Sequence, residues 1–133
     1  LYVLGSTQEE THSTGAITAA YEIAPRMCVA VDVTHGDSPD ASKHETFQLG
    51  GGPVIGVGPN CAASMSGRMK AVAKQIELPV QIEVMSGSSG TNAWPVQVSR
   101  EGVATALEVV SRQDLEDTAR LLAAFVCAIK EGT

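Results

Sequence analysis

Two adjacent carboxylates, Glu9 and Glu10, follow an apolar run at the start of the chain, and a third acid, Asp32, ends a second apolar run. In open α/β sheets, binding and catalytic sites form beyond the carboxyl ends of strands, which is where these acids are expected. Carboxylates gathered there repel one another and lose hydration. A divalent ion is the natural compensation and leaves one carboxylate free to accept a proton from a metal-bound water. The simpler alternative is that each acid caps the helix that follows it.

Other residues with chemical potential give weaker signals. His12, His35 and His44 lack the short helical spacing of zinc motifs, and loop histidines of this kind are usually solvated. The Gly-rich residues 50–53 lack the Lys-Ser/Thr of a phosphate-binding loop, so a turn is favoured. No Ser or Cys has the context of a nucleophile elbow, which leaves little support for covalent catalysis.

Alternating strands and helices must position these residues. Apolar patterning predicts strands at residues 1–4, 27–31, 54–57, 80–84 and 103–110, and helices at 14–23, 64–76 and 115–130. Gln81 and Glu83 give the fourth of these strands a polar face. In the last helix, which Ser111 and Asp114 are expected to cap, a buried stripe is predicted at Leu115, Ala119, Leu122, Val126 and Ile129. This alternation predicts an α/β fold with a mixed, mostly parallel sheet and helices packed on it.

The composition restricts the class of protein. The 133 residues fit one domain, and an apolar content of 44% is enough for a core. The net charge of −6 and the lack of a Lys/Arg cluster argue against nucleic acid or an anionic membrane as a partner. No apolar run approaches the roughly 18 residues of a membrane helix. The widely spaced Cys28, Cys61 and Cys127 predict buried free thiols and a reducing, cytoplasmic setting.

Several segments together resemble one family. They are STQEETHSTGA, VAVDVTHGDSPD, LGGGPVIGVGP, GTNAW, SREGVATAL and EVVSRQDLEDTARLLAAFV. They occur in the order, and with nearly the spacing, of the dinuclear-metal aminopeptidases. This family includes the tetrahedral (TET), glutamyl and deblocking aminopeptidases and proteins known as cellulase M or endoglucanase. The resemblance covers almost the whole chain, and the paired Glu combined with the later Val-Asp is its most specific part.

The resemblance implies a fold and a function. The fold is a zinc-peptidase-like three-layer sandwich with helices on both faces of the sheet. Glu9 resembles the general base, while Glu10 and Asp32 resemble ligands of a centre of two divalent ions, zinc or cobalt. The implied reaction removes amino-terminal residues from peptides, and the implied assembly is a homo-oligomer, often a dodecamer.

The family also contains parts that this chain lacks. Its members supply a His and the metal-bridging Asp from a segment that precedes residue 1, and a second ligand His from a loop that falls between Leu107 and Glu108. Residues 1–133 are therefore expected to be a single, incomplete domain, part of a metallo-aminopeptidase catalytic domain. Missing segments are expected before residue 1 and between residues 107 and 108, the latter of about a dozen residues. Asn92 stands where the family often has Asp, and Gly51 where it often has Lys.

Two other functions compete with this interpretation. The missing ligands favour a catalytically inactive fragment or relative that acts as an assembly or peptide-binding module. A cellulase is less well supported, because carboxylates flanking a glycosidic bond lie about 5–10 Å apart beside aromatic sugar platforms. Adjacent Glu residues and a single Trp fit that arrangement poorly.

Overall fold

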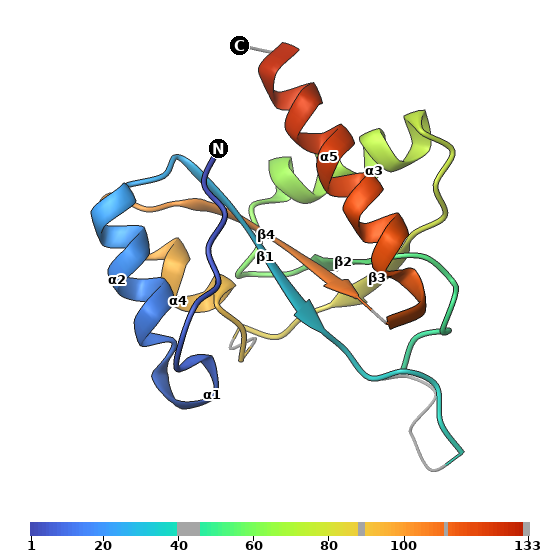
Figure 1. Ribbon diagram of the computed structural model, residues 1–133, viewed down its shortest axis with the longest axis horizontal. Helices are drawn as coiled ribbons and strands as arrows, with labels where there is room; N and C mark the ends of the chain where they lie inside the picture. The colour runs from blue at the N-terminus through green and yellow to red at the C-terminus, as the bar shows by residue number, and fades with distance from the viewer. Residues whose placement is uncertain (40–45, 88–89, 111, 132–133) are drawn as a thin grey trace.

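In the described part of the chain, four strands form one mixed sheet in the order β1-β4-β2-β3 (Figure 1). The computed structural model describes residues 1–39, 46–87, 90–110 and 112–131, without the side chains of 113, 130 and 131. The strands are β1 (Met27–Val33), β2 (Val54–Val57), β3 (Gln81–Val84) and β4 (Ala104–Val110). β1 pairs with β4 and β2 with β3 in parallel, while β2 and β4 are antiparallel. The predicted mixed, mostly parallel sheet is confirmed.

Helices cover both faces of this sheet. They are α1 (Glu9–His12), α2 (Thr14–Ile23), α3 (Ala63–Gln75), α4 (Ala93–Gln97) and α5 (Leu115–Glu131), with a 3-10 turn at Arg112–Asp114. Ala106 of β4 packs in the core beneath α3 and α5, whereas Val103 and Cys28 pack against α2 and α4. Because consecutive strand residues point to opposite faces, the two helix pairs lie on opposite sides of the sheet. The predicted three-layer arrangement is therefore confirmed.

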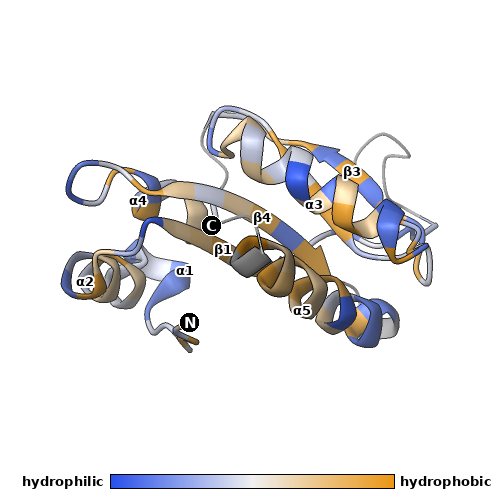
Figure 2. Ribbon diagram, turned by 90° about the horizontal axis from the view of Figure 1, so that it is seen from above, coloured by the Kyte–Doolittle hydropathy of each residue, from blue (hydrophilic) through white to orange (hydrophobic). Residues whose placement is uncertain are grey.

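The main core lies between the sheet and the pair α3 and α5. β1, β4 and much of α5 are apolar (Figure 2). Met65, Met69 and Val72 of α3 are buried at the predicted helical spacing, against Ile55 of β2 and Phe125 of α5. This spacing places one apolar stripe of α3 toward the sheet. No helix in the described part of the chain is both long and apolar enough to cross a membrane.

The first apolar run does not form the predicted strand. Residues 1–4 have no regular structure, and their side chains are between 53% and 93% exposed. A strand is stable only when a neighbour pairs with its backbone groups. No backbone hydrogen bond between residues 1–6 and a strand is found in the described part of the chain. The prediction of a buried strand here is wrong because apolarity alone does not provide a pairing partner.

The buried stripe predicted for α5 is confirmed only in part, because Leu122 and Ile129 are partly buried against the core. Leu115 is 61% exposed and Ala119 is exposed, whereas Leu121 and Phe125 are almost fully buried. Leu121 and Phe125 belong to a second apolar stripe, next to the predicted one around the helix. Packing against α3 and β4 selects this second stripe, because it places the large Phe125 ring in the core.

The predicted strand at residues 103–110 is continuous through Leu107 and Glu108. β4 pairs residue by residue with β1 from Ala104 to Val110. The side chain of Glu108 is 0% exposed, and neither of its carboxylate oxygens has a hydrogen-bond partner in the described residues. Burial raises the pKa of Glu108 to about 8. The strand therefore carries an uncompensated acid into the core at the junction where the family resemblance implies a missing loop.

The connecting segments follow the prediction in part. Residues 40–45 lie outside the described residues, and on either side of them Gly36 and Phe47 form an isolated β-bridge. Ser111, the predicted cap, also lies outside the described residues. Asp114 accepts hydrogen bonds from the backbone N–H groups of Gly50 and Gly52, at 3.1 and 2.9 Å. The Gly-rich residues 50–53 are therefore a turn held by a carboxylate.

All three cysteines are free thiols, as predicted. Cys28 and Cys61 are half-buried. Cys127 is exposed, so the prediction that it is buried is wrong.

Candidate functional site

A short helix positions the paired acids. Glu9 and Glu10 form the first turn of α1, which lies between two left-handed residues, Gln8 with φ 60° and Ser13 with φ 50°. The segment before α1 is fixed at two points. The N–H of Gly15 donates to the carbonyl of Thr7 at 3.2 Å, and Nδ2 of Asn92 donates to Oγ of Ser6 at 2.9 Å. These bonds hold the acids beside α2 and the start of α4.

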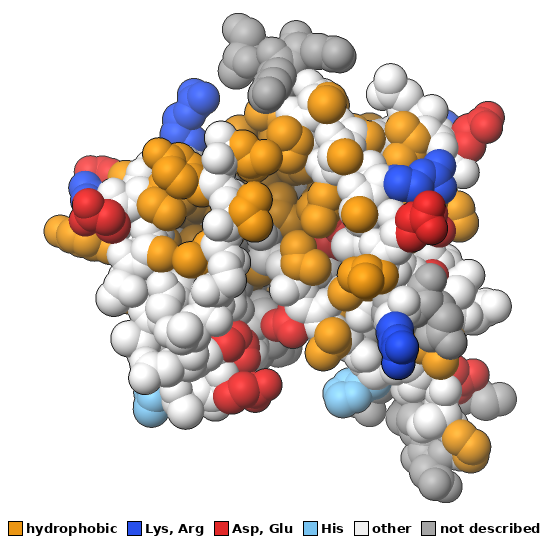
Figure 3. Space-filling model, in the orientation of Figure 1, with side chains coloured by type: hydrophobic (Ala, Val, Ile, Leu, Met, Phe, Trp, Pro, Cys, Tyr) orange, Lys and Arg blue, Asp and Glu red, His pale blue; other side chains and the backbone are white. Residues whose placement is uncertain are grey.

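Asp32 lies near the end of β1 and points to the face that α2 and α4 cover. It lies four residues after Cys28 in the same strand, so its side chain points to the face on which Cys28 packs. Its Oδ1 accepts a hydrogen bond from the N–H of Val33 at 2.8 Å. Acidic side chains gather over α1 and the end of β1 (Figure 3). Partial burial raises the pKa of Glu9, and the negative charges of Asp32 and Glu10 raise it further.

The donors in the described residues do not form a complete metal centre. No group of three or more His, Cys, Asp or Glu side chains is arranged there to hold an ion. His12 and His35 are exposed at separate places, and His44 lies outside the described residues. Zinc and cobalt favour imidazole and thiolate ligands, whereas carboxylates alone suit harder cations. Glu9, Glu10 and Asp32 therefore lack both the number and the kind of donors that a pair of such ions needs.

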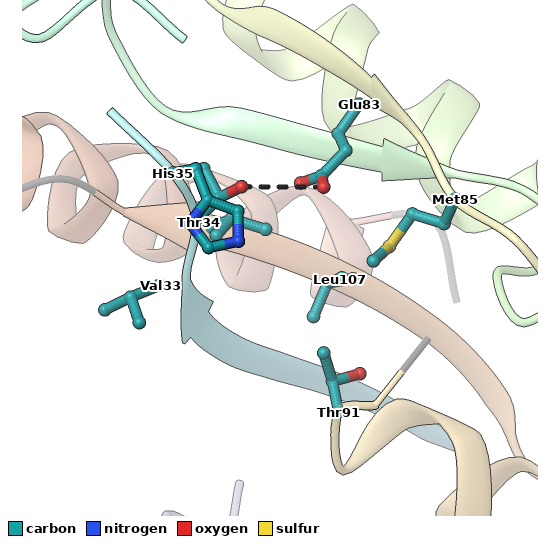
Figure 4. Close-up of a pocket in the computed structure, with 8 residues that line it drawn as sticks. Val33, Thr34, His35, Glu83, Met85, Thr91 and Leu107 are labelled. Carbon is teal, nitrogen blue, oxygen red and sulfur yellow. Dashed lines mark hydrogen bonds between the residues drawn. The ribbon is translucent and has the colours of Figure 1, made fainter. Parts of the chain in front are cut away.

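A cavity of about 230 Å³ lies beside the end of β1 (Figure 4). Its apolar walls are Val33, Met85, Leu107 and Val109. Its polar lining is Thr34, His35, Glu83 and Thr91. The sequence indicated only that Glu83 belongs to the polar face of a strand. The cavity was not predicted, because its lining comes from segments up to 76 residues apart, between Val33 and Val109.

Two departures from the family pattern have local structural consequences. Asn92 donates its side-chain N–H to Ser6, which a carboxylate at this position could not do. A Cβ at Gly51 would lie only 2.8 Å from Nε2 of Gln81. That amide bridges the carbonyls of Gln48 and Gly52, at 3.0 and 3.2 Å. A lysine at position 51 would therefore require this bridge to move.

Known proteins with similar sequences and folds are aminopeptidases. A family model described as M42 glutamyl aminopeptidase matches residues 1–115. The chain belongs to this family. A lysyl aminopeptidase from Pyrococcus furiosus is 34% identical to this M42 family member over 142 aligned positions, which cover 98% of this chain and 41% of the relative.

Solved structures of the TET type share the fold of this M42 family member. A TET aminopeptidase from the marine sediment archaeon Thaumarchaeota archaeon SCGC AB-539-E09 superimposes with a TM-score of 0.80 at 24% identity, over 90% of this chain and 38% of that chain. The dodecamer PhTET1-12s superimposes with a TM-score of 0.68 at 23% identity, over 91% of this chain and 39% of that chain. The chain thus spans about two fifths of the length of the relatives that it matches.

Proposed function

We propose that this chain is part of a metal-dependent aminopeptidase that removes amino-terminal residues from peptides. The supporting observation is the family match over residues 1–115, together with the electrostatic neighbourhood that Glu9 shares with Asp32 and Glu10. In this proposal Glu9 is the general base, and Glu10 and Asp32 are ligands of a centre of two zinc or cobalt ions. The pKa of Glu9 is shifted upward, which is the direction that favours proton acceptance by a general base.

The remaining ligands are proposed to come from protein segments outside this sequence. We place one segment before residue 1 and another, of about a dozen residues, between Leu107 and Glu108. The alignment to the lysyl aminopeptidase covers 142 positions, more than the 133 residues of the chain, so the relative has residues within the aligned region that this chain lacks. The buried, unpartnered Glu108 supports the same junction. Residues 1–133 are thus one incomplete part of a catalytic domain.

The assembly and setting of the longer protein are also proposals. The PhTET1-12s relative forms a dodecamer, which supports a homo-oligomer and specifically a dodecamer here. Free thiols support a cytoplasmic setting. The name of the lysyl aminopeptidase relative makes peptides that begin with lysine the first substrates to assay.

A second candidate function is a non-catalytic assembly or peptide-binding module. The observation that favours it is the absence of a converging metal-donor group in the described residues. Under this alternative, the fold is retained to present a surface or to hold a peptide without cleaving it.

Peptidase assays separate the two candidates. The 133-residue chain and the full-length parent are each incubated with peptide amides and added cobalt or zinc, and the released amino-terminal residues are measured. We expect activity in the parent that a chelator abolishes, and none in the short chain. In the parent, Glu9→Gln should lower kcat by about 100-fold or more, whereas Glu101→Gln, at an exposed acid, should not.

Three outcomes would contradict the proposal or part of it. Strong activity of the short chain would contradict the claim that its 133 residues hold too few metal ligands. Full activity of the Glu9→Gln parent would remove Glu9 from the general-base role. A parent that binds peptides without releasing any residue would support the binding module.

A further inference from the structure

The carboxylate of Glu83 lies in the cavity without a strong partner. Its Oε2 is shielded from solvent and has no hydrogen-bond donor in the described part of the chain. Its Oε1 accepts a long bond of 3.5 Å from Oγ1 of Thr34 (Figure 4). A shielded carboxylate oxygen without a donor costs free energy that a protonated amine or other strong donor would recover. A ligand that carries such a group would therefore bind favourably at Glu83.

The walls of the cavity define the rest of that ligand. Met85, Leu107 and Val109 provide an apolar surface beside the carboxylate. No Lys or Arg belongs to the described lining, and His35 is exposed. An aliphatic chain that ends in an ammonium group matches both features, because its methylenes pack on the walls while its head reaches Glu83. A neutral or anionic head would leave the carboxylate without compensation.

The cavity and the acids Glu9, Glu10 and Asp32 belong to one region of the fold. Through the strand registers, Glu83, Leu107 and Asp32 point to the same face of the sheet. Residues 33–35, which line the cavity, follow Asp32 directly. A ligand whose cationic end lies at Glu83 can therefore extend its other end along this face toward Asp32, whose negative charge also acts on Glu9.

We propose that Glu83 and the cavity around it form the recognition pocket for an alkylammonium side chain, that of an amino-terminal lysine in a peptide substrate. This inference rests on the proposed aminopeptidase function for the identity of the ligand. The pocket itself is defined by the geometry alone. Glu83 is then a residue that determines specificity and has no part in bond cleavage.

A binding experiment tests the pocket without catalysis. n-Butylammonium is titrated into the 133-residue chain, and the methyl resonance of Met85 is followed by NMR, with n-butanol as the neutral probe. We expect saturable binding of the ammonium, weakened by about tenfold or more in Glu83→Gln, and much weaker binding of the alcohol. Glu101→Gln, an exposed acid outside the cavity, is the matched control and should bind as the unaltered chain does.

Several results would overturn the pocket. The proposal is wrong if ammonium binding does not saturate, or if ammonium and alcohol bind equally well. It is also wrong if Glu83→Gln binds ammonium as tightly as the unaltered chain does, or if equimolar zinc displaces the ammonium. If Glu83→Gln does not fold, Glu83→Asp withdraws the carboxylate by one methylene and should also weaken binding. Unchanged affinity in that folded variant would overturn the proposal too.

A kinetic experiment separates this inference from the proposed function. In the full-length parent, Glu83→Gln should lower kcat/KM for lysine-initiated peptides by about tenfold or more through KM, and leave leucine-initiated peptides nearly unchanged. An unchanged lysine-to-leucine ratio would refute the specificity role while the peptidase function stands. Ammonium binding at Glu83 in a parent without peptidase activity would refute the function and keep the pocket.

Discussion

Glu108 shows how a single residue conflicts with its surroundings. It lies fully buried in the centre of the sheet beside Ile55, and both carboxylate oxygens lack partners among the described residues. Because burial disfavours the charged form, the folded chain retains the proton of Glu108 up to about pH 8, whereas the ordinary pKa is 4.5. The folded state therefore binds more protons than the unfolded state between these two pH values.

The stability of the chain should consequently fall as the pH rises from about 4.5 to about 8 and then level off. Glu108→Leu removes this titration and the buried polar atoms. We expect it to raise the free energy of unfolding at pH 8 by about 1–3 kcal/mol and to flatten the pH profile. Urea denaturation at pH 5, 6.5 and 8 measures both effects. Glu101→Gln should keep the slope of the unaltered chain, and the same slope in Glu108→Leu would contradict the assignment.

At the scale of the element, α5 combines a well-packed apolar stripe with one poorly placed hydroxyl. Thr118 is 2% exposed and its Oγ1 has no partner in the described residues. Thr105 of β4 is equally buried, but its Oγ1 donates to the carbonyl of Asn60 at 2.5 Å. The two threonines are thus a matched pair that differs in one hydrogen bond.

Replacement of each threonine by the isosteric valine should have opposite effects. Thr118→Val removes a buried hydroxyl that lacks an acceptor, so we expect an unchanged or higher free energy of unfolding, by up to about 1 kcal/mol. Thr105→Val removes a made hydrogen bond and should lower this free energy by about 1 kcal/mol or more. Thermal and urea unfolding of the two variants give the comparison. Equal destabilisation by both would show that Thr118 has a partner.

At the scale of the whole molecule, β1 leaves an open edge. It is one of the two edge strands of the described sheet, with β3 at the other edge, and its Val31 and Val33 are 50% and 75% exposed. The apolar residues 1–4 are exposed as well. Unpaired backbone groups on an apolar edge strand promote pairing with another chain.

The 133-residue chain should therefore self-associate through β1. Val31→Lys introduces a charge at this edge. It should raise the protein concentration at which half of the chains are associated by about tenfold, which weakens the free energy of association by ~1.4 kcal/mol. Val98→Lys, at a position that is 69% exposed beyond α4, is the control and should not change it. Light scattering across a concentration series gives the midpoints. Equal shifts in both variants would point to a general effect of charge instead of edge pairing.

Much of the local structure, and the candidate acids themselves, could be predicted from the sequence. The bounds of α2 and β2 follow the prediction, because helix and strand periodicity depend on residues close in the chain. The family follows from segments whose order and spacing are visible without coordinates, as the match over residues 1–115 bears out. The roles of Glu9, Glu10 and Asp32 came from this resemblance and remain proposals.

Which surfaces of the chain pack against each other could be seen only in the folded structure. It left residues 1–4 exposed, and it buried Leu121 and Phe125 of α5 more deeply than the predicted stripe. It also brought Thr34 to Glu83, which lies 49 positions away in the chain. Such outcomes depend on strand order and packing between distant segments, which local periodicity does not encode. The physical reason is that burial and pairing are properties of two surfaces, and a sequence pattern describes only one of them.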